Sequence, residues 1–132
     1  MRRALIFLVR LSPVLFIAFS AMIYVLKVEA GVAYPFRNLV PMLIVVALAV
    51  ITLVKGGGLW TGAGWRWLLG TTGFAIPAIG LSIYIHYGYD VDLNGMVSES
   101  VYPTEVFRYL PIYTTIAGGI GFAIGWIAGR NV

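Results

Sequence analysis

The sequence predicts an all-α integral membrane protein with four transmembrane helices, and three observations support this prediction. Of the 132 residues, 61% are hydrophobic and 11% are charged, whereas soluble domains contain about 25% charged residues. The apolar residues form four runs, each close to the ~17–25 residues that a helix needs to cross a bilayer. These runs use most of the chain, so we expect a single four-helix transmembrane domain over residues 1–132 and no separate soluble domain.

The first two predicted spans are residues 9–26 and 38–54. Pro13 lies in the first turns of the first span, where the lack of a backbone amide hydrogen costs the helix least. The second span is uncharged and rich in valine, leucine and isoleucine, with Thr52 as a polar residue within it. Because this span is apolar all round, we expect it to face lipid.

The third and fourth predicted spans are residues 67–87 and 110–129. Pro77 lies near the middle of the third span and predicts a kink there. The connections differ in kind. Residues 55–66 are rich in glycine and tryptophan, whereas residues 88–109 form a loop of about 20 residues between the third and fourth helices.

The basic residues predict that both ends of the chain lie on the cytoplasmic side, because lysine and arginine are enriched in cytoplasmic loops. This N-in, C-in orientation places six basic residues inside and three outside. The inner set is Arg2, Arg3, Arg10, Lys55, Arg66 and Arg130, and the outer set is Lys27, Arg37 and Arg108. The natural location is the inner (plasma) membrane of a bacterial cell. The net charge of +4 is scattered along the chain, so we expect no nucleic-acid partner.

All five carboxylates lie in predicted outward-facing loops: Glu29, Asp90, Asp92, Glu99 and Glu105. We therefore expect no ionised acid and no ionisable pair inside the membrane. Most proton- and cation-coupled transporters need such groups there, so this expectation disfavours that class of protein. His86 is the sole histidine, and we expect it to form hydrogen bonds at the interface, because one ligand does not make a zinc or haem site. The chain has no cysteine and no plausible catalytic set, so we expect neither an enzyme nor a resident cofactor.

Residues 90–95 (DVDLNG) match the first half of a calcium-binding loop, D-x-[DN]-x-[DN]-G. In such a loop Asp90, Asp92 and Asn94 would supply oxygen ligands. The twelfth position, which normally supplies a bidentate glutamate, is Val101. Two interpretations stay open: a weakly bound calcium ion, or an Asn-Gly turn in an acidic, solvated loop.

Small residues predict close helix packing in the last two spans. Gly118, Gly121 and Gly125 belong to a glycine-zipper pattern in the fourth span, and Gly73 and Gly80 belong to a stripe in the third. Small residues let helices approach closely in lipid. Either these two spans pack on each other, or one glycine face docks against another polypeptide.

Together these features favour an accessory or structural subunit of a larger membrane complex, acting through helix–helix and outer-loop contacts. Its expected partners are the lipid bilayer and other membrane protein subunits. Arg10 could snorkel to the inner surface or pair with a partner's carboxylate. The alternative function is a small homo-oligomeric transporter or channel for an anion or neutral solute. A third class is a lysis or immunity-type membrane protein, for which toxicity on expression would be the discriminating observation.

Overall fold

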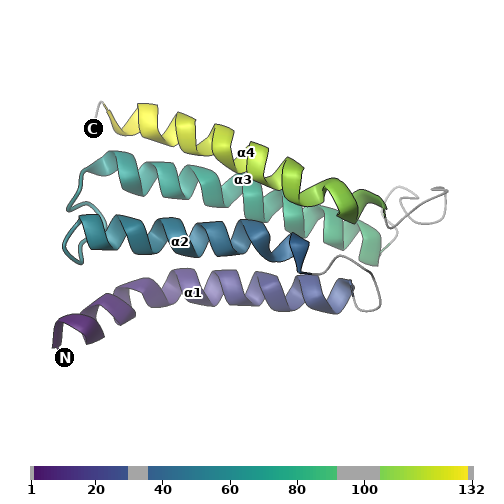
Figure 1. Ribbon diagram of the computed structural model, residues 1–132, viewed down its shortest axis with the longest axis horizontal. Coiled ribbons are helices and arrows are strands. Elements are labelled where there is room, and N and C mark those ends of the chain that lie inside the picture. Colours follow the sequence, from purple (N-terminus) through teal and green to yellow (C-terminus); the bar gives the residue numbers. More distant parts are fainter. Residues whose placement is uncertain (1, 30–35, 92–104, 131–132) are drawn as a thin grey trace.

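The protein is described by a computed structural model over residues 2–29, 36–91 and 105–130, and in these residues all regular structure is helical. The helices are α1 (Arg2–Val28), α2 (Val40–Lys55), α3 (Trp65–Asp90) and α4 (Glu105–Gly129), and a 3-10 turn, η1 (Arg37–Leu39), precedes α2. The four long helices lie side by side along one axis, and both chain termini lie at the same end (Figure 1). We call this end the terminal end and the opposite end the distal end.

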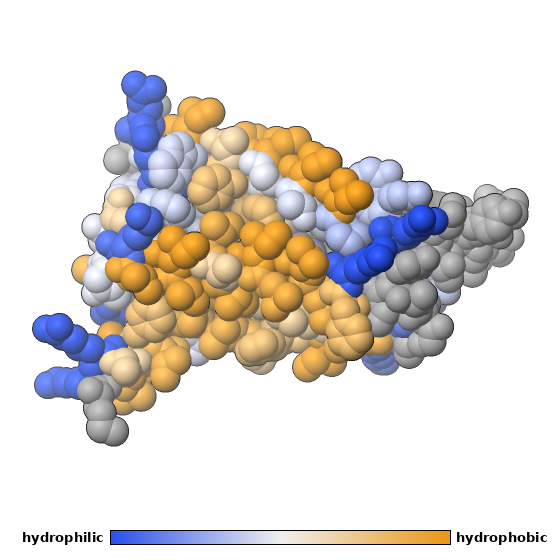
Figure 2. Space-filling view, in the orientation of Figure 1, coloured by the Kyte–Doolittle hydropathy of each residue, from blue (hydrophilic) through white to orange (hydrophobic). Residues whose placement is uncertain are grey.

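Each of the four helical segments is long and apolar enough to cross a membrane, so the protein is a multi-pass membrane protein. Figure 2 shows an apolar belt around the middle of the visible face, with hydrophilic side chains toward the two ends. Helices suit this environment because they satisfy their backbone hydrogen bonds internally.

The helix boundaries differ from the predicted spans. Helix α1 begins at Arg2 rather than at residue 9, and it continues to Val28. Helices α3 and α4 both extend further toward the distal end than predicted, to Asp90 and from Glu105 respectively. The connection between them is therefore shorter than the predicted loop. The run of apolar residues predicts the part of each helix that crosses the hydrocarbon. The helix itself can extend beyond that part at either end.

Helices α3 and α4 form the most extensive contact in the bundle, because their backbones touch at glycines. A Cβ added to Gly73 would clash with the carbonyl oxygen of Gly121, and one added to Gly121 would clash with the carbonyl oxygen of Gly73. Pro77 has no amide hydrogen to donate to the Gly73 carbonyl. The Cα hydrogen of Gly121 points at this oxygen instead, in a Cα–H···O contact of the kind common at helix interfaces.

The same interface continues along α4 in both directions. Gly125 lies against the carbonyl group of Leu69, and Gly118 lies against the ring of Phe74. Gly73, Gly118, Gly121 and Gly125 therefore all contact the neighbouring helix of their own chain, and docking of a glycine face on another polypeptide stays a prediction. Gly80 is different, because a Cβ added there would meet no atom within 4 Å.

Helix α2 buries one face against the other helices and exposes the opposite face, which includes Leu43, Ile51 and Val54. The prediction that it faces lipid therefore fits the exposed face and is wrong for the buried one. The buried positions of α2 recur every three or four residues, and the apolar ones are Met42, Val45, Ala49 and Leu53. Thr52 is also buried, and its hydroxyl donates a hydrogen bond to the Leu48 carbonyl and lies 2.9 Å from the hydroxyl of Thr71. The buried face could not be predicted because a protein interior and hydrocarbon are both apolar, so hydropathy does not distinguish them.

Aromatic and basic side chains gather at the terminal end. The rings of Trp67 and Trp126 meet edge to face, with centroids 5.3 Å apart. The guanidinium of Arg66 lies 5.5 Å from the centre of the Trp126 ring, and the ammonium of Lys55 lies 5.3 Å from that of Trp67. Tryptophan is enriched where hydrocarbon meets the headgroups, so this end has the composition of a membrane–water boundary.

Candidate functional site

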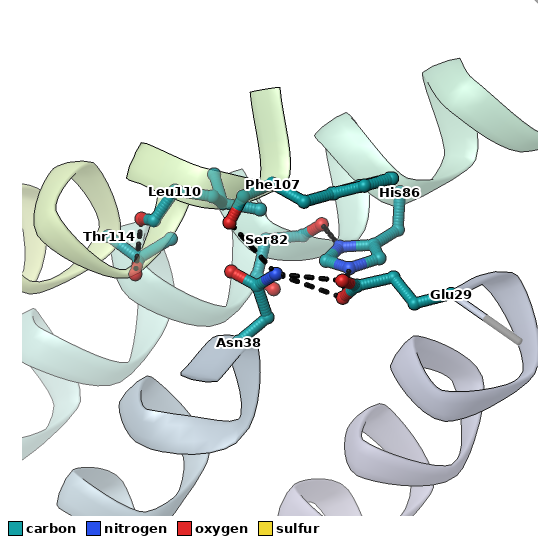
Figure 3. Close-up of polar contacts among 7 residues, drawn as sticks. All are labelled: Glu29, Asn38, Ser82, His86, Phe107, Leu110 and Thr114. Atoms are coloured by element: carbon teal, nitrogen blue, oxygen red, sulfur yellow. Dashed lines mark hydrogen bonds and ion pairs between the residues drawn. The ribbon is translucent and has the colours of Figure 1, made fainter. Parts of the chain in front are cut away.

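A carboxylate and an imidazole meet inside the distal end of the bundle (Figure 3). Nε2 of His86, from α3, lies 2.6 Å from Oε2 of Glu29, which follows the last residue of α1. Both side chains are 0% exposed. The backbone places them there: the Glu29 amide still donates to the Val25 carbonyl, so this residue caps the last turn of α1 and its side chain turns inward.

The hydrogen bonds around His86 determine how many protons the pair holds. Nδ1 lies 2.6 Å from the carbonyl oxygen of Ser82, and a carbonyl only accepts, so Nδ1 carries a hydrogen. The contact between Nε2 and Glu29 then needs one further proton between the two atoms. That proton makes either an imidazolium with a carboxylate or a neutral imidazole with a carboxylic acid. Both arrangements have zero net charge, which suits burial in an apolar bundle.

Asn38 of η1 completes the hydrogen bonding of the carboxylate. Its side-chain nitrogen donates to both oxygens of Glu29, at 2.9 and 3.0 Å, and to the carbonyl oxygen of Phe107 in α4, at 3.1 Å. The Phe107 ring stacks on the imidazole of His86, with centroids 4.8 Å apart and planes inclined by 25°. We call Glu29, Asn38, His86 and Phe107 the distal cluster. It joins the end of α1, η1, α3 and α4 at one buried point.

The distal cluster corrects the sequence-based picture of the acids. Glu29 does not lie in a solvated outer loop, because its side chain is completely buried. The expectation of no ionisable pair inside the membrane did not foresee the buried contact of Glu29 with His86, and the hydrogen bonds expected of His86 lie inside the protein. The first span was predicted to end at Leu26, which assigned Glu29 to the loop. In the structure the helix continues to Val28 and carries Glu29 into contact with α3.

One signal in the sequence could have revealed this cluster. Glu29, Asn38 and His86 each lie within a few residues of the same predicted membrane surface, at the ends of three different spans. Polar side chains at one depth on separate helices can reach one another, and a buried polar group needs a partner. The position of Phe107 had no comparable signal, because it contributes its backbone carbonyl and its ring.

Arg10 lies at the opposite half of the bundle. Its side chain is half-buried and donates a hydrogen bond to the carbonyl oxygen of Gly58, in the turn between α2 and α3. Gly58 has a positive φ of 94°, a conformation that glycine adopts readily. Arg10 thus ties α1 to the turn at the terminal end.

The predicted calcium ligands fall mostly outside the described residues. Asp90 is the last residue of α3 and is exposed, whereas Asp92 and Asn94 lie outside the described ranges. Within residues 2–29, 36–91 and 105–130, no three histidine or acidic side chains gather as a metal site would require. The calcium hypothesis therefore stays a prediction.

Comparisons of this chain with known protein families, with curated proteins and with solved structures found no match. The distal cluster is enclosed by the segments that build it. Its polar side chains form hydrogen bonds to one another and to backbone carbonyls. The cluster can therefore hold one proton and join four segments of the chain.

Proposed function

We propose that this protein is an accessory or structural subunit of a larger membrane complex and that the outward face of α4 contacts its partner. One observation supports the proposal. The outward face of α4 carries a row of exposed isoleucines, on the side away from the glycines that contact α3. The row consists of Ile112, Ile116, Ile120, Ile124 and Ile127, each between 55% and 65% exposed.

This row has the geometry of a packing ridge. Residues four apart form ridges that fit the grooves of a second helix. Isoleucine has a stiff χ1 in a helix, so it loses little freedom when another surface covers it. Gly119 and Ala123 are exposed beside the ridge and leave a shallow furrow, and a Cβ added to Gly119 would meet nothing within 4 Å. Helices in lipid associate through such close fits.

Photo-crosslinking from the ridge tests this proposal. With benzoylphenylalanine at Ile120 or Ile124 in the native host membrane, we expect adducts to another polypeptide, because the reactive ring would lie in the interface. The matched control positions are Phe16 and Ile23 of α1, which are 74% and 67% exposed. These should give no such adduct. The products are read by mass on a denaturing gel and identified by peptide sequencing.

Extraction in a mild detergent followed by sizing separates the two candidate functions. An assembly that contains other polypeptides supports the accessory subunit. A homo-oligomer, with crosslinks only between copies of this chain, would instead favour the alternative of a small transporter or channel. Equal adducts from α1 and α4 would contradict a defined contact face.

We further propose that the terminal end faces the cytoplasm, with the bacterial inner membrane as the location. Both termini lie at this end (Figure 1), and so do Arg10, Lys55 and Arg66. Because the chain has no cysteine, single introduced cysteines give unambiguous labelling. In intact cells a membrane-impermeant maleimide should label Val91→Cys, at the distal end, and should label Thr61→Cys only after permeabilisation. The reverse pattern would invert the proposed orientation.

A further inference from the structure

An apolar groove runs between α1 and α3, with α2 at its back. Its volume is about 570 Å³, and its walls include Val14 and Ile17 of α1 and Ile76 and Gly80 of α3. Ile17 is 55% exposed and Ile76 is 69% exposed, so the groove opens on the outer surface of the bundle. Such a groove in a membrane is filled by whatever apolar molecule surrounds the protein.

The groove has a charged end and an apolar end. Arg10 and Trp60 lie at the end nearer the chain termini, whereas Gly80 lies beyond the middle of α3. From Leu68 to Gly80 the groove follows α3 for about 18 Å at the rise of an α-helix. One leaflet of a bilayer contributes roughly half of the ~30 Å hydrocarbon core. The groove is therefore about as long as one leaflet is thick.

The charge around Arg10 favours an anion at this end. Arg10 also lines a second hollow, which contains Arg3 and the glycine turn at Gly57 and Gly58. Among the described residues, the acidic positions 29, 90 and 105 all lie at the distal end, away from Arg10. A guanidinium has five N–H donors, and among the described residues the Gly58 carbonyl takes one of them.

We propose that the groove binds an anionic phospholipid, with one acyl chain between α1 and α3 and the phosphate against Arg10. The apolar walls accommodate the chain, the length matches one leaflet, and the arginine lies where a headgroup would be. An arginine near the membrane surface contributes about 1 kcal/mol toward binding an anionic lipid. This corresponds to a roughly fivefold preference for the anionic lipid over a zwitterionic one.

Quenching of Trp60 measures this preference directly. The purified protein is placed in phosphatidylcholine vesicles that contain a minority of lipid with brominated acyl chains, either phosphatidylglycerol or phosphatidylcholine. The difference between the wild-type chain and Trp60→Phe isolates the contribution of Trp60, which lines the groove. We expect brominated phosphatidylglycerol to quench Trp60 at a roughly fivefold lower lipid fraction than brominated phosphatidylcholine.

Two pairs of variants identify the groups responsible. Arg10→Gln should abolish the difference between the lipids, whereas Arg66→Gln removes a charge at the same end of the bundle and should preserve it. Gly80→Leu should fill the groove and reduce quenching by both lipids, since the glycine faces open space. Gly119→Leu adds the same side chain at an equally open glycine of α4 and should have no effect. Helix content by circular dichroism confirms that each variant is folded.

Three results would overturn the proposal. Equal quenching by the two lipids in the wild-type chain would show that Arg10 does not select the anionic lipid. An equal loss of preference in Arg66→Gln would show a diffuse surface charge rather than a site. Crosslinks from Ile76 to another polypeptide, together with no quenching of Trp60 by either lipid, would assign the groove to a protein partner.

Discussion

Replacing His86 with alanine is expected to lower the free energy of unfolding by about 3–5 kcal/mol, because it leaves Glu29 buried without its imidazole partner. Glu29→Ala should have a similar effect, since it leaves Nε2 of His86 without the carboxylate and removes two of the acceptors of the Asn38 amide. Ordinary side-chain hydrogen bonds between membrane helices contribute only about 0.6 kcal/mol on average. We expect the larger loss of stability because the substitution leaves a buried ionisable group without its partner. Unfolding in mixed detergent micelles, followed by circular dichroism, measures the difference.

Glu29→Gln is the matched control for this experiment. A glutamine amide can donate to Nε2 of a neutral His86, and its carbonyl can accept from Asn38, so both side chains that contact Glu29 keep a hydrogen bond to position 29. We expect this variant to retain most of the wild-type stability. If Glu29→Gln were as unstable as Glu29→Ala, a neutral form of the pair would not support the fold. If all three variants were as stable as wild type, the distal cluster would not join the helices as inferred.

Gly121→Ala should destabilise the protein by about 1–3 kcal/mol, the range for overpacked interiors. The added Cβ would collide with the carbonyl oxygen of Gly73, and a backbone atom cannot move aside by changing its rotamer. Helices α3 and α4 would have to separate, which would also loosen the contact of Gly125 with Leu69. The same unfolding assay measures the effect. Cysteines introduced into α3 should also become more accessible to a labelling reagent.

Gly119→Ala separates this packing effect from helix propensity. Gly119 lies on the same helix with open space around it, so alanine should leave stability unchanged or raise it by up to about 1 kcal/mol. Equal effects at positions 119 and 121 would contradict the close approach of α3 and α4.

The four helices were predictable because the membrane imposes a minimum length of apolar chain, and the sequence shows that length four times. The glycine spacing also predicted close packing of small residues, since Gly121 and Gly125 recur at the helical interval. Which surface these residues contact could not be read from the sequence. Spacing places residues on one face of a helix but does not say what lies opposite.

The distal cluster could not be predicted by assigning residues to spans or loops. Glu29 lies just past an apolar run, and two more residues of helix decide whether its side chain meets water or His86. The buried face of α2 escaped prediction for a different reason. Met42 and Leu53 are as apolar as residues that face lipid, and only the arrangement of the other helices distinguishes the two environments.

The arrangement of the distal cluster has a consequence for biogenesis. Glu29 and Asn38 belong to the first helical hairpin, whereas His86 and Phe107 belong to the second. The ribosome makes the first hairpin before the second exists, so a newly inserted half-chain holds an acid whose base has not yet been synthesised. Docking of the two hairpins then brings acid and base together, so the distal cluster forms only when both hairpins are present.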